Sequence, residues 1–402
     1  MTVTRRVGDI ADVFNGKTPA KADQRVSGFP VLKIKDVNAR GQFSGEFESF
    51  VDDQFAQRHK AKCLRTDDIL VLNAAHNADY VGSKQYLAER SVEGSLATGE
   101  WLIARSKSED LNQRYLWHWF QSSQTRFKLK KIVKGIHLYP KDVADQLITL
   151  PPIEEQRRIA AILDKADAIH RKQCDALELQ ERQIKSLFVH SVGPNANGYA
   201  RWEKKPIRDL ALSKKGAMRT GPFGSDLKHS EFVDDGIAVL GIDNAVKNRF
   251  AWDERRFITE EKYLKLKRYQ VFPGDVIITI MGTTGRSSVV PKDIPTAITT
   301  KHLATISLDL DKAEPEFISN AIHRHPALLS QIRSQNKGAI MAGLNLGIIK
   351  ELEVPMPPIE VQREFTRSLG MLRQMHSKTE NALLKAEEML ASLSQRAFRG
   401  EL

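Results

Sequence analysis

Pro-Pro-Ile-Glu-Glu-Gln-Arg at residues 151–157 returns as Pro-Pro-Ile-Glu-Val-Gln-Arg at residues 357–363, an offset of 206 residues. The same offset carries Ser186-Leu187 onto Ser392-Leu393. Solenoid repeats have periods of about 20 to 50 residues, so this spacing indicates a duplicated module instead. Each copy opens a stretch with helical patterning. The sequence therefore predicts a globular segment and a long helix, followed by a second such pair.

Each copy of the motif has the features of a helix start. The first proline disfavours the α region for the residue before it, and the second suits a first helical turn. Glu154 and Glu155 follow where the helix dipole stabilises acidic side chains. We predict spacer helices within residues 151–192 and 356–402, which leaves globular modules at 1–150 and 193–355.

Apolar residues recur at spacings of three and four along both helices, as in the narrow seam of a coiled coil. Two matching seams are expected to pack against each other, and the linker at 193–198 favours an antiparallel pair. The polar seam residues Gln173, Gln180 and Thr379 favour this arrangement over packing of each helix on its own module. The predicted helix-pair interface contains Ile159, Ile162, Ala166, Ile169, Leu177, Ile184, Leu187, Phe365, Leu372, Met375, Leu383, Leu390 and Leu393.

The two modules resemble each other more weakly than the helices do. Residues 31–36 align with 239–244, and residues 67–71 align with 274–278. Short β-rich runs bounded by Gly, Asp and Pro predict strands of a mixed α/β module. Amphipathic stretches follow, and the aromatic residues of the first are predicted to lie in the core. These stretches are residues 111–132, with Tyr115, Trp119, Phe120 and Phe127, and residues 316–335, broken near Pro326.

The net charge of +11 is concentrated in the modules, each of which carries +5, while the helices are nearly neutral. Equal excesses of positive charge are typical of a polyanion bound twice, because lysine and arginine release counterions from phosphates. The two cysteines, Cys63 and Cys174, offer neither a disulfide framework nor zinc-ligand spacing. The sequence shows no signal peptide or membrane span, so we expect a soluble cytosolic protein.

No catalytic constellation is recognised in the sequence. Residues 16–18, Gly-Lys-Thr, imitate the end of a P-loop, but the required earlier glycine is Ala11. Residues 282–285, Gly-Thr-Thr-Gly, lack the lysine. His323 and His325 have no partner cysteines and are predicted to be surface histidines instead of metal ligands. The sequence therefore predicts a binding protein, whose divergent module loops suit two different targets.

These residues resemble the specificity subunit of Type I restriction-modification enzymes. The resemblance is carried by the duplicated helix-start motif, by Gly-Asp-Val-Ile at 274–277, and by Gly-Pro-Phe-Gly-Ser-Asp-Leu-Lys at 221–228. Lys337-Gly338 and Asn345 add to it, and it covers essentially the whole chain. The first module departs from the pattern, since it lacks the Gly-Pro-Phe-Gly-Ser run and has Asp67 at the position of Gly274.

The resemblance implies an α+β fold of two α/β target-recognition domains. Two long helices would join them as an antiparallel coiled coil with internal pseudo-two-fold symmetry. Each domain would read one half of a bipartite double-stranded DNA target. The chain would be a non-catalytic, cytoplasmic, prokaryotic subunit without a cofactor. Its partners would be two methyltransferase subunits, which use S-adenosylmethionine, and restriction subunits, which use ATP and bind through the methyltransferase.

Three other interpretations stay open at this point. The chain could be the recognition adaptor of another DNA modification or defence complex. It could be a DNA nuclease or methyltransferase with an unrecognised active site, in which case the isolated chain would react with DNA. A purely structural coiled-coil protein would not bind DNA even at low salt.

Base reading requires hydrogen-bond donors and acceptors in the major groove, so loop residues with Lys, Arg, Asn, Thr or His are the candidates. In the first module they are Lys17, Thr18, Lys33, Lys35, His76, Asn77, Lys134 and His137. In the second module they are Arg219, Lys228, Thr283, Thr284, Arg286, Lys337 and Asn345. Candidates for phosphate contacts are Arg126, Lys128, Lys130, Lys131, Lys262, Lys265, Lys267 and Arg268.

Overall fold

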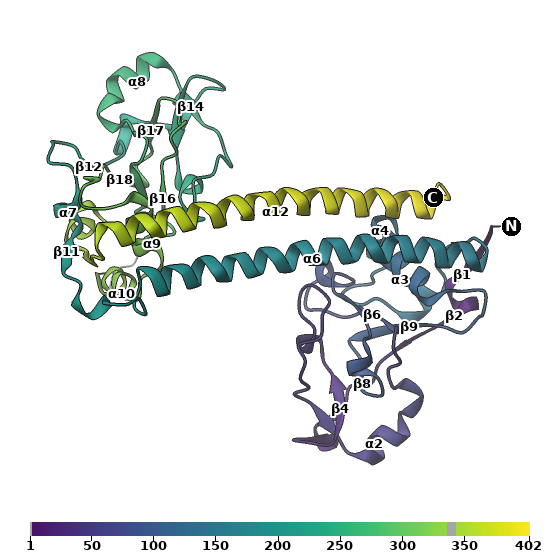
Figure 1. The fold of residues 1–402 in the computed structure, drawn as a ribbon. Coiled ribbons are helices and arrows are strands. Elements are labelled where there is room, and N and C mark those ends of the chain that lie inside the picture. The colour runs from purple at the N-terminus through teal and green to yellow at the C-terminus, as the bar shows by residue number, and fades with distance from the viewer. Residues whose placement is uncertain (1, 336–342) are drawn as a thin grey trace. The chain divides into compact units, whose positions relative to one another are not determined.

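A computed structural model describes residues 2–335 and 343–402 of the chain, which folds into two compact units (Figure 1). Unit 1 runs to Asp175 and also contains Glu380–Leu402, whereas unit 2 is Ala176–Thr379. The long helices α6 (Ile153–Ser191) and α12 (Ile359–Arg399) each contribute one part to either unit. We call residues 2–150 module 1 and residues 193–355 module 2.

Module 1 is built on a four-stranded sheet with strand order β2-β9-β6-β7 and a smaller sheet with order β3-β5-β4-β8. Its strands are β1 (Val3–Arg6), β2 (Ala11–Asn15), β3 (Gln24–Arg25), β4 (Phe29–Leu32), β5 (Phe50–Val51), β6 (Ile69–Leu72), β7 (Gln85–Leu87), β8 (Leu96–Ala97), β9 (Trp101–Ser106) and β10 (Leu147–Leu150). Its helices are α1 (Val7–Ile10), α2 (Asp53–Arg58), α3 (Gln113–Gln121), α4 (Ser123–Lys131) and α5 (Pro140–Ala144).

Module 2 repeats this plan, with a four-stranded sheet of order β12-β18-β15-β16 and a three-stranded sheet of order β14-β13-β17. Its strands are β11 (Lys204–Pro206), β12 (Met218–Thr220), β13 (Ile237–Leu240), β14 (Phe257–Ile258), β15 (Val276–Thr279), β16 (Ser287–Val289), β17 (Ala297–Thr299), β18 (Leu303–Ile306) and β19 (Glu353–Pro355). Its helices are α7 (Ile207–Leu210), α8 (Glu260–Leu266), α9 (Pro315–Arg324), α10 (Pro326–Gln335) and α11 (Leu346–Glu351).

The central strand of each module is buried on both faces. In β6, Ile69 and Val71 face a core shared with α3 and the start of α6, while Leu70 and Leu72 face a second core with Tyr86 and Trp101. A strand covered on both sides needs a continuous apolar run, and Ile-Leu-Val-Leu supplies one. In β15, Val276 and Ile278 likewise face one core, while Ile277 faces a second core on the other side of the sheet. The mixed α/β modules predicted from the sequence are thereby confirmed.

The duplicated motif ties each module to the start of its helix. Gln156 is buried, and its side-chain carbonyl accepts a hydrogen bond from the Asn112 N–H (3.0 Å). Its amide also donates to the carbonyls of Pro151 and Asp110 (2.8 Å each). Gln362 repeats this arrangement, accepting from the Glu314 N–H (3.0 Å) and donating to the Pro357 carbonyl (2.9 Å). The motif glutamine therefore joins a helix start to the N-terminus of α3 or α9.

Within each unit the two helix segments run antiparallel. In unit 1, Ile159 and Leu163 share a core with Ala397, and His170 further along α6 meets Glu387, earlier in α12 (3.6 Å). In unit 2, the Gln180 amide donates to Thr379 Oγ1 (3.0 Å), and Phe188 packs on Phe365 with ring centroids 6.0 Å apart. Residue numbers thus rise along α6 as they fall along α12 in both units.

The predicted seam is displaced by one position at its centre. The structure buries Ile159, Ala166, Ile184 and Phe365, half-buries Ile162, Leu177, Leu187, Leu372, Leu383, Leu390 and Leu393, and leaves Ile169 and Met375 exposed. In their place the seam contains the next residue along each helix. His170 contacts Glu387 (3.6 Å), and His376 contacts Glu181 (3.2 Å). Polar side chains therefore fill these two seam positions, and the prediction that Ile169 and Met375 lie in the interface was wrong.

Two further predictions need correction. The amphipathic stretch at residues 111–132 forms two helices, because Ser122 is extended and caps α4 by accepting from the Thr125 N–H (3.2 Å). The break turns Phe127 outward, under the Lys131 ammonium, while Tyr115, Trp119 and Phe120 are buried as predicted. His325 is buried beside Phe188 and Tyr199, and His323 is half-buried against Arg286, so neither is a surface histidine.

Candidate nucleic-acid interface

Glycine brings the first loop of each module against the neighbouring sheet. A Cβ on Gly16 would lie 2.3 Å from the carbonyl oxygens of Ala97 and Thr98. A Cβ on Gly221 would lie 2.1 Å from the Thr300 carbonyl oxygen. Any side chain would therefore push the loop away from the ends of β8 and β17. The loops share this close approach although their sequences differ, as Gly-Lys-Thr-Pro and Gly-Pro-Phe-Gly.

Four loops converge at one edge of the sheet of module 1. The Gly99 N–H donates to Thr18 Oγ1 (2.8 Å), and the Asn73 N–H donates to the Glu100 carbonyl (2.9 Å). The Leu138 N–H donates in turn to the Asn73 carbonyl (2.7 Å). We call loops 16–19, 73–80, 98–100 and 133–138 the loop edge of module 1. It brings together six of the predicted residues, all exposed: Lys17, Thr18, His76, Asn77, Lys134 and His137.

Module 2 has an equivalent loop edge, formed by loops 221–228, 280–286, 300–302 and 343–345. The Ile280 N–H donates to the His302 carbonyl (2.8 Å), and the Leu344 N–H donates to the Ile280 carbonyl (3.0 Å). These bonds match those of Asn73 and Leu138 in module 1. The loop edge of module 2 contains the predicted residues Lys228, Thr283, Thr284, Arg286 and Asn345. Lys337 lies outside the described residues.

Cations at the loop edge of module 1 act on one another. Burial and then the positive charge of Lys17 lower the pKa of Lys62, whose ammonium donates to the Asn15 carbonyl (2.7 Å). Burial, Lys17 and Arg58 lower the pKa of His59. At the other loop edge, burial, Lys301 and Arg256 lower the pKa of His302. The sequence prediction missed Lys62, His59, Lys301 and His302 because they lie between the recognised loops. Repulsion of this kind is relieved when a polyanion binds.

Several predicted residues lie elsewhere. The Arg219 guanidinium points inward, where it pairs with the buried Asp275 (2.6 Å) and donates to the Gln270 carbonyl (2.7 Å). The equivalent aspartate of module 1, Asp68, pairs with Arg105 from a different strand (2.5 Å). The structure therefore does not bring Arg219 to the loop edge. Lys33 and Lys35 follow β4, and Lys35 pairs with Glu48.

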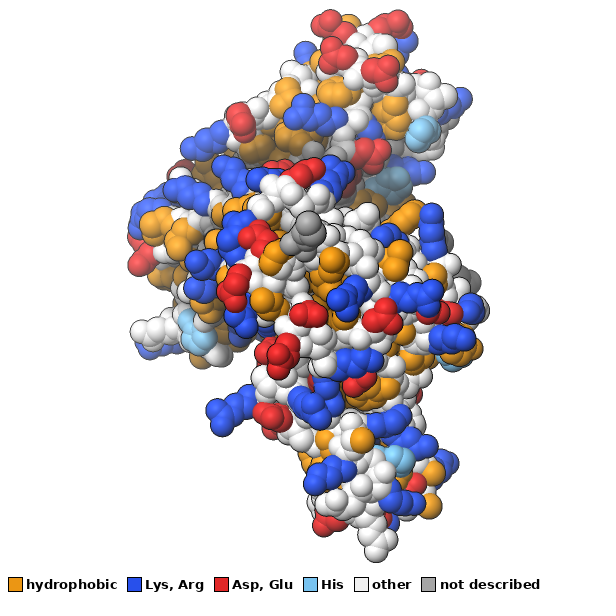
Figure 2. All heavy atoms as spheres, turned by 90° about the vertical axis from the view of Figure 1, so that its right-hand side faces the viewer, with side chains coloured by type: hydrophobic (Ala, Val, Ile, Leu, Met, Phe, Trp, Pro, Cys, Tyr) orange, Lys and Arg blue, Asp and Glu red, His pale blue; other side chains and the backbone are white. Residues whose placement is uncertain are grey.

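The phosphate candidates lie on α4, on α8 and on the turn that follows α8. Lys128, Lys130 and Lys131 are exposed on α4, which leads into loop 133–138. Arg126 is exposed on the same helix and bonds Gln121. Arg268 reaches Asp226 in loop 221–228 (3.4 Å), and Lys267 precedes it. Lys262 pairs with Glu231 (2.6 Å) and Lys265 with Glu261 (2.7 Å). On the face drawn in Figure 2, basic side chains alternate with acidic and apolar ones.

Arg286 is turned toward α9, where its guanidinium donates to His323 Nε2 (3.2 Å). Burial, Arg324, Arg286 and Arg373 lower the pKa of His323 to about 3. The folded protein thus keeps this imidazole neutral, whereas the unfolded chain protonates it near its usual value of about 6.5. The unfolded state then binds more protons between these two values, so stability is full above about pH 6.5 and falls as the pH drops.

We therefore expect acidification to destabilise unit 2 through His323. Urea unfolding at several pH values should show a loss of up to about 1.4 kcal/mol per pH unit below about pH 6, in addition to other titrations. His323→Gln should remove that part of the slope, since glutamine takes up no proton. The matched control is His190→Gln, which alters an exposed histidine on α6. Equal slopes for the wild-type chain and His323→Gln would contradict the assignment.

Each module thus carries an equivalent loop edge with exposed lysine and other hydrogen-bonding side chains, an arrangement typical of a protein that binds nucleic acid at two places. The chain matches the family of Type I restriction modification DNA specificity domains twice, over residues 2–179 and 200–386. It belongs to this family and is a Type I restriction-modification specificity subunit with one recognition domain for each part of a bipartite DNA target.

Relatives over the whole length support this identification. The chain is 23% identical to the EcoBI specificity subunit of Escherichia coli, over 98% of this chain and 84% of that protein. It is 22% identical to the MjaVIII specificity subunit of Methanocaldococcus jannaschii, over 96% and 90%. Its fold resembles the S subunit of a Type I system from M. genitalium, with a TM-score of 0.64, 14% identity, and coverage of 99% and 96%. No helix in the described part of the chain has the length and apolar character of a membrane span.

Proposed function

We propose that each loop edge reads one half of the bipartite DNA target. The observation that carries this proposal is the convergence, at equivalent edges of both modules, of loops that diverge in sequence and expose hydrogen-bonding side chains. Lys17, Thr18, His76, Asn77, Lys134 and His137 would face the bases in module 1. Lys228, Thr283, Thr284 and Asn345 would do so in module 2. Their donors and acceptors suit the major groove.

Phosphate contacts would position these edges on the duplex. Lys128, Lys130 and Lys131 of module 1 and Lys267 and Arg268 of module 2 are exposed cations close to the loop edges. Such contacts supply affinity without sequence information, whereas the loop residues supply specificity. Thr18 Oγ1 accepts a bond from the Gly99 N–H (2.8 Å) and its hydroxyl donates to Glu100 Oε2 (3.4 Å), so a base would take this hydrogen by displacing Glu100.

Family membership supports a set of partners for the chain. We infer that it is non-catalytic and holds no cofactor, and that two methyltransferase subunits bind it and supply S-adenosylmethionine. Restriction subunits, which use ATP, would join through the methyltransferase. Two modules built on one plan suit two copies of a single partner, because each copy can meet an equivalent surface. We infer that this assembly works in the cytoplasm of a prokaryote, as its family membership and DNA target suggest.

DNA binding by the chain alone tests the loop-edge assignment. We expect affinity for a duplex to fall about 100- to 1,000-fold between about 50 and 200 mM salt, since five phosphate contacts give a log–log slope of about −4.5. Lys128→Ala, which removes one proposed phosphate contact beside the loop edge of module 1, should lower the slope of log affinity against log salt by about one. The matched control is Lys107→Ala, which removes the same charge at the opposite end of β9. Equal effects of the two substitutions in fluorescence anisotropy titrations would count against the proposal.

A further inference from the structure

The motif glutamines establish which positions of the two module–helix junctions are equivalent. Gln156 and Gln362 accept from the N–H groups of Asn112 and Glu314. Two residues after these, Arg114 on α3 and Glu316 on α9 therefore occupy the same place. The 206-residue offset likewise pairs Asp164 and Asp167 of α6 with Gly370 and Arg373 of α12.

At the first junction, the module is positive and the helix is negative. Arg114 binds both carboxylate oxygens of Asp164, through Nη2 (2.7 Å) and Nε (3.2 Å), and His118 Nε2 lies 2.8 Å from the same side chain. Burial acts to raise the pKa of Asp164, but His118 and Arg114 outweigh it and hold that pKa below its usual value. The carboxylate is therefore charged and held by module 1.

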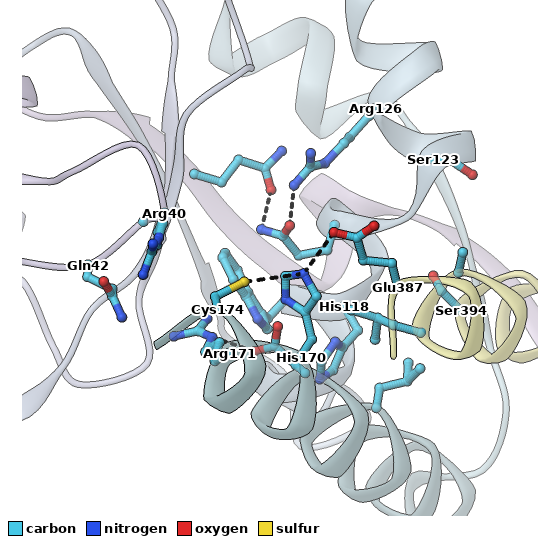
Figure 3. A pocket seen from close by; sticks show the side chains of 18 of the residues that line it. Arg40, Gln42, His118, Ser123, Arg126, His170, Arg171, Cys174, Glu387 and Ser394 are labelled. Atoms are coloured by element: carbon cyan, nitrogen blue, oxygen red, sulfur yellow. Dashed lines mark hydrogen bonds and ion pairs between the residues drawn. The ribbon is translucent and has the colours of Figure 1, made fainter. Parts of the chain in front are cut away.

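A second pair of the same polarity lies along this junction. Arg40, from a loop of module 1, pairs with Asp175 of α6 (3.3 Å). Both line a cavity of about 600 Å³ between the module and the helices. Figure 3 shows Arg40 and His118 at this cavity with His170, Arg171 and Cys174 of α6. Module 1 thus contributes cations to acidic positions at two levels of α6.

The second junction has the opposite polarity. Arg373 of α12 donates from Nη1 to Glu316 Oε1 of α9 (2.6 Å) and from Nη2 to the Asn248 carbonyl (2.5 Å). Both charged side chains are about three-quarters buried, with 23% and 24% of their surfaces exposed. Here the acid belongs to the module and the cation to the helix. The charge at the matched module positions 114 and 316 is reversed. On the helices, Arg373 lies at the match of Asp167, which pairs with Arg171 (2.8 Å), one turn beyond the match of Asp164.

We propose that these exchanged ion pairs are a charge code that assigns each module to its own helix. Module 2 on α6 would bring Glu316 against Asp164 and Asp167. Module 1 on α12 would bring Arg114 and His118 beside Arg373, with Gly370 in the place of Asp164. Like charges brought together at a half-buried site are unfavourable, whereas each native pairing is attractive. Arg114, Asp164, Glu316 and Arg373 are thus positioning residues that determine which half-site lies on which side of the gap.

Charge-exchange variants of the whole subunit, assembled with its methyltransferase, test this code. Arg114→Asp or Asp164→Arg alone should lower the methylation rate at the native target about tenfold, the effect of about 1.4 kcal/mol. Each should also permit methylation of targets whose gap differs by one base pair, because the module is no longer held in one orientation. The double variant should restore the rate to within about twofold and the single gap length. Glu316→Arg and Arg373→Glu should behave in the same way.

The matched control is Arg158→Glu, which reverses one charge of the exposed Glu155–Arg158 pair on α6 and should change neither rate nor gap. Double variants that remain as impaired as the single ones would overturn the code. This outcome is independent of which loop residues read bases, so it is distinguishable from failure of the loop-edge assignment.

A transposed chain tests the same code at the level of modules. Residues 3–150 are replaced by a second copy of residues 203–356, so that module 2 precedes α6. A repaired chain is the same chain with Glu316→Arg in its first copy of module 2. We expect the transposed chain to have a yield of assembled complex and a methylation rate at least about tenfold lower than those of the repaired chain. The repaired chain should methylate a target with the half-site of module 2 on both sides. Equal activity of the two chains would overturn the code. If neither assembles, the charge-exchange variants decide.

Discussion

Exchanging module 2 for the corresponding module of a related specificity subunit is expected to change one half of the methylated target and abolish methylation of the original one. The other half and the gap should stay the same. The physical reason is that the first and last strands of module 2 pair with each other, with Lys204 of β11 opposite Pro355 of β19, so the module begins and ends at one place. Its loop edge is formed by its own loops, so a replacement introduces a complete reading surface.

The exchange is best made at residues 203–356, with an acid kept at position 316 so that Arg373 retains its partner. Methylome sequencing of a host that expresses the whole complex gives the target directly. Reciprocal exchange of module 1 at residues 3–150 should change the other half-site. An unchanged target, or the loss of both half-sites by a chain that still folds and assembles, would show that the modules do not read independently.

Lengthening both helices is expected to lengthen the unread gap and leave both half-sites the same. Four residues inserted after Asp175 of α6 and four after Thr379 of α12 fall where the two units divide. Four residues are close to one turn, so the seam stays nearly in phase, and each helix grows by about 6 Å. At about 3.4 Å per base pair, the gap should increase by one or two pairs. Methylation at the original spacing should be lost.

Insertions of two residues at the same places provide the control. They rotate the seam by roughly half a turn, so the apolar positions on either side of the insertion no longer face the same way. Such a chain should fail to assemble. A four-residue variant that assembles and still methylates DNA with the original gap would show that the helices do not determine the spacing.

The long helices could be predicted from the sequence because their signals are local. Prolines, acidic first turns and spacings of three and four are visible in the chain itself. The centre of the seam could not be predicted, because His170 and His376 occupy it while Ile169 and Met375 face outward. A polar side chain in a seam depends on its partner across the interface, here Glu387 or Glu181, and that partner is distant in sequence.

The candidate interface was predictable to a similar degree. Loop residues such as Lys17 and Asn77 were found by residue type and position between strands. The role of Arg219 was not, because the buried Asp275 that takes its guanidinium lies 56 residues away in the chain. Lys62 was missed for the converse reason, since only folding brings its ammonium beside the loop of Gly16 (3.3 Å to the carbonyl). Long-range electrostatics thus decide which cations stay free for a ligand.

The division of the helices between the units also determines when, during synthesis, each unit has all of its residues. Unit 2 is one continuous segment, Ala176–Thr379, so every part of it has been synthesised before the last helical turns are made. Unit 1 is discontinuous: its core joins Val7 and Tyr115 to Ala397 and Phe398. The module that is translated first therefore holds an uncovered apolar surface until the final residues arrive. During this interval the growing chain is exposed to misassembly.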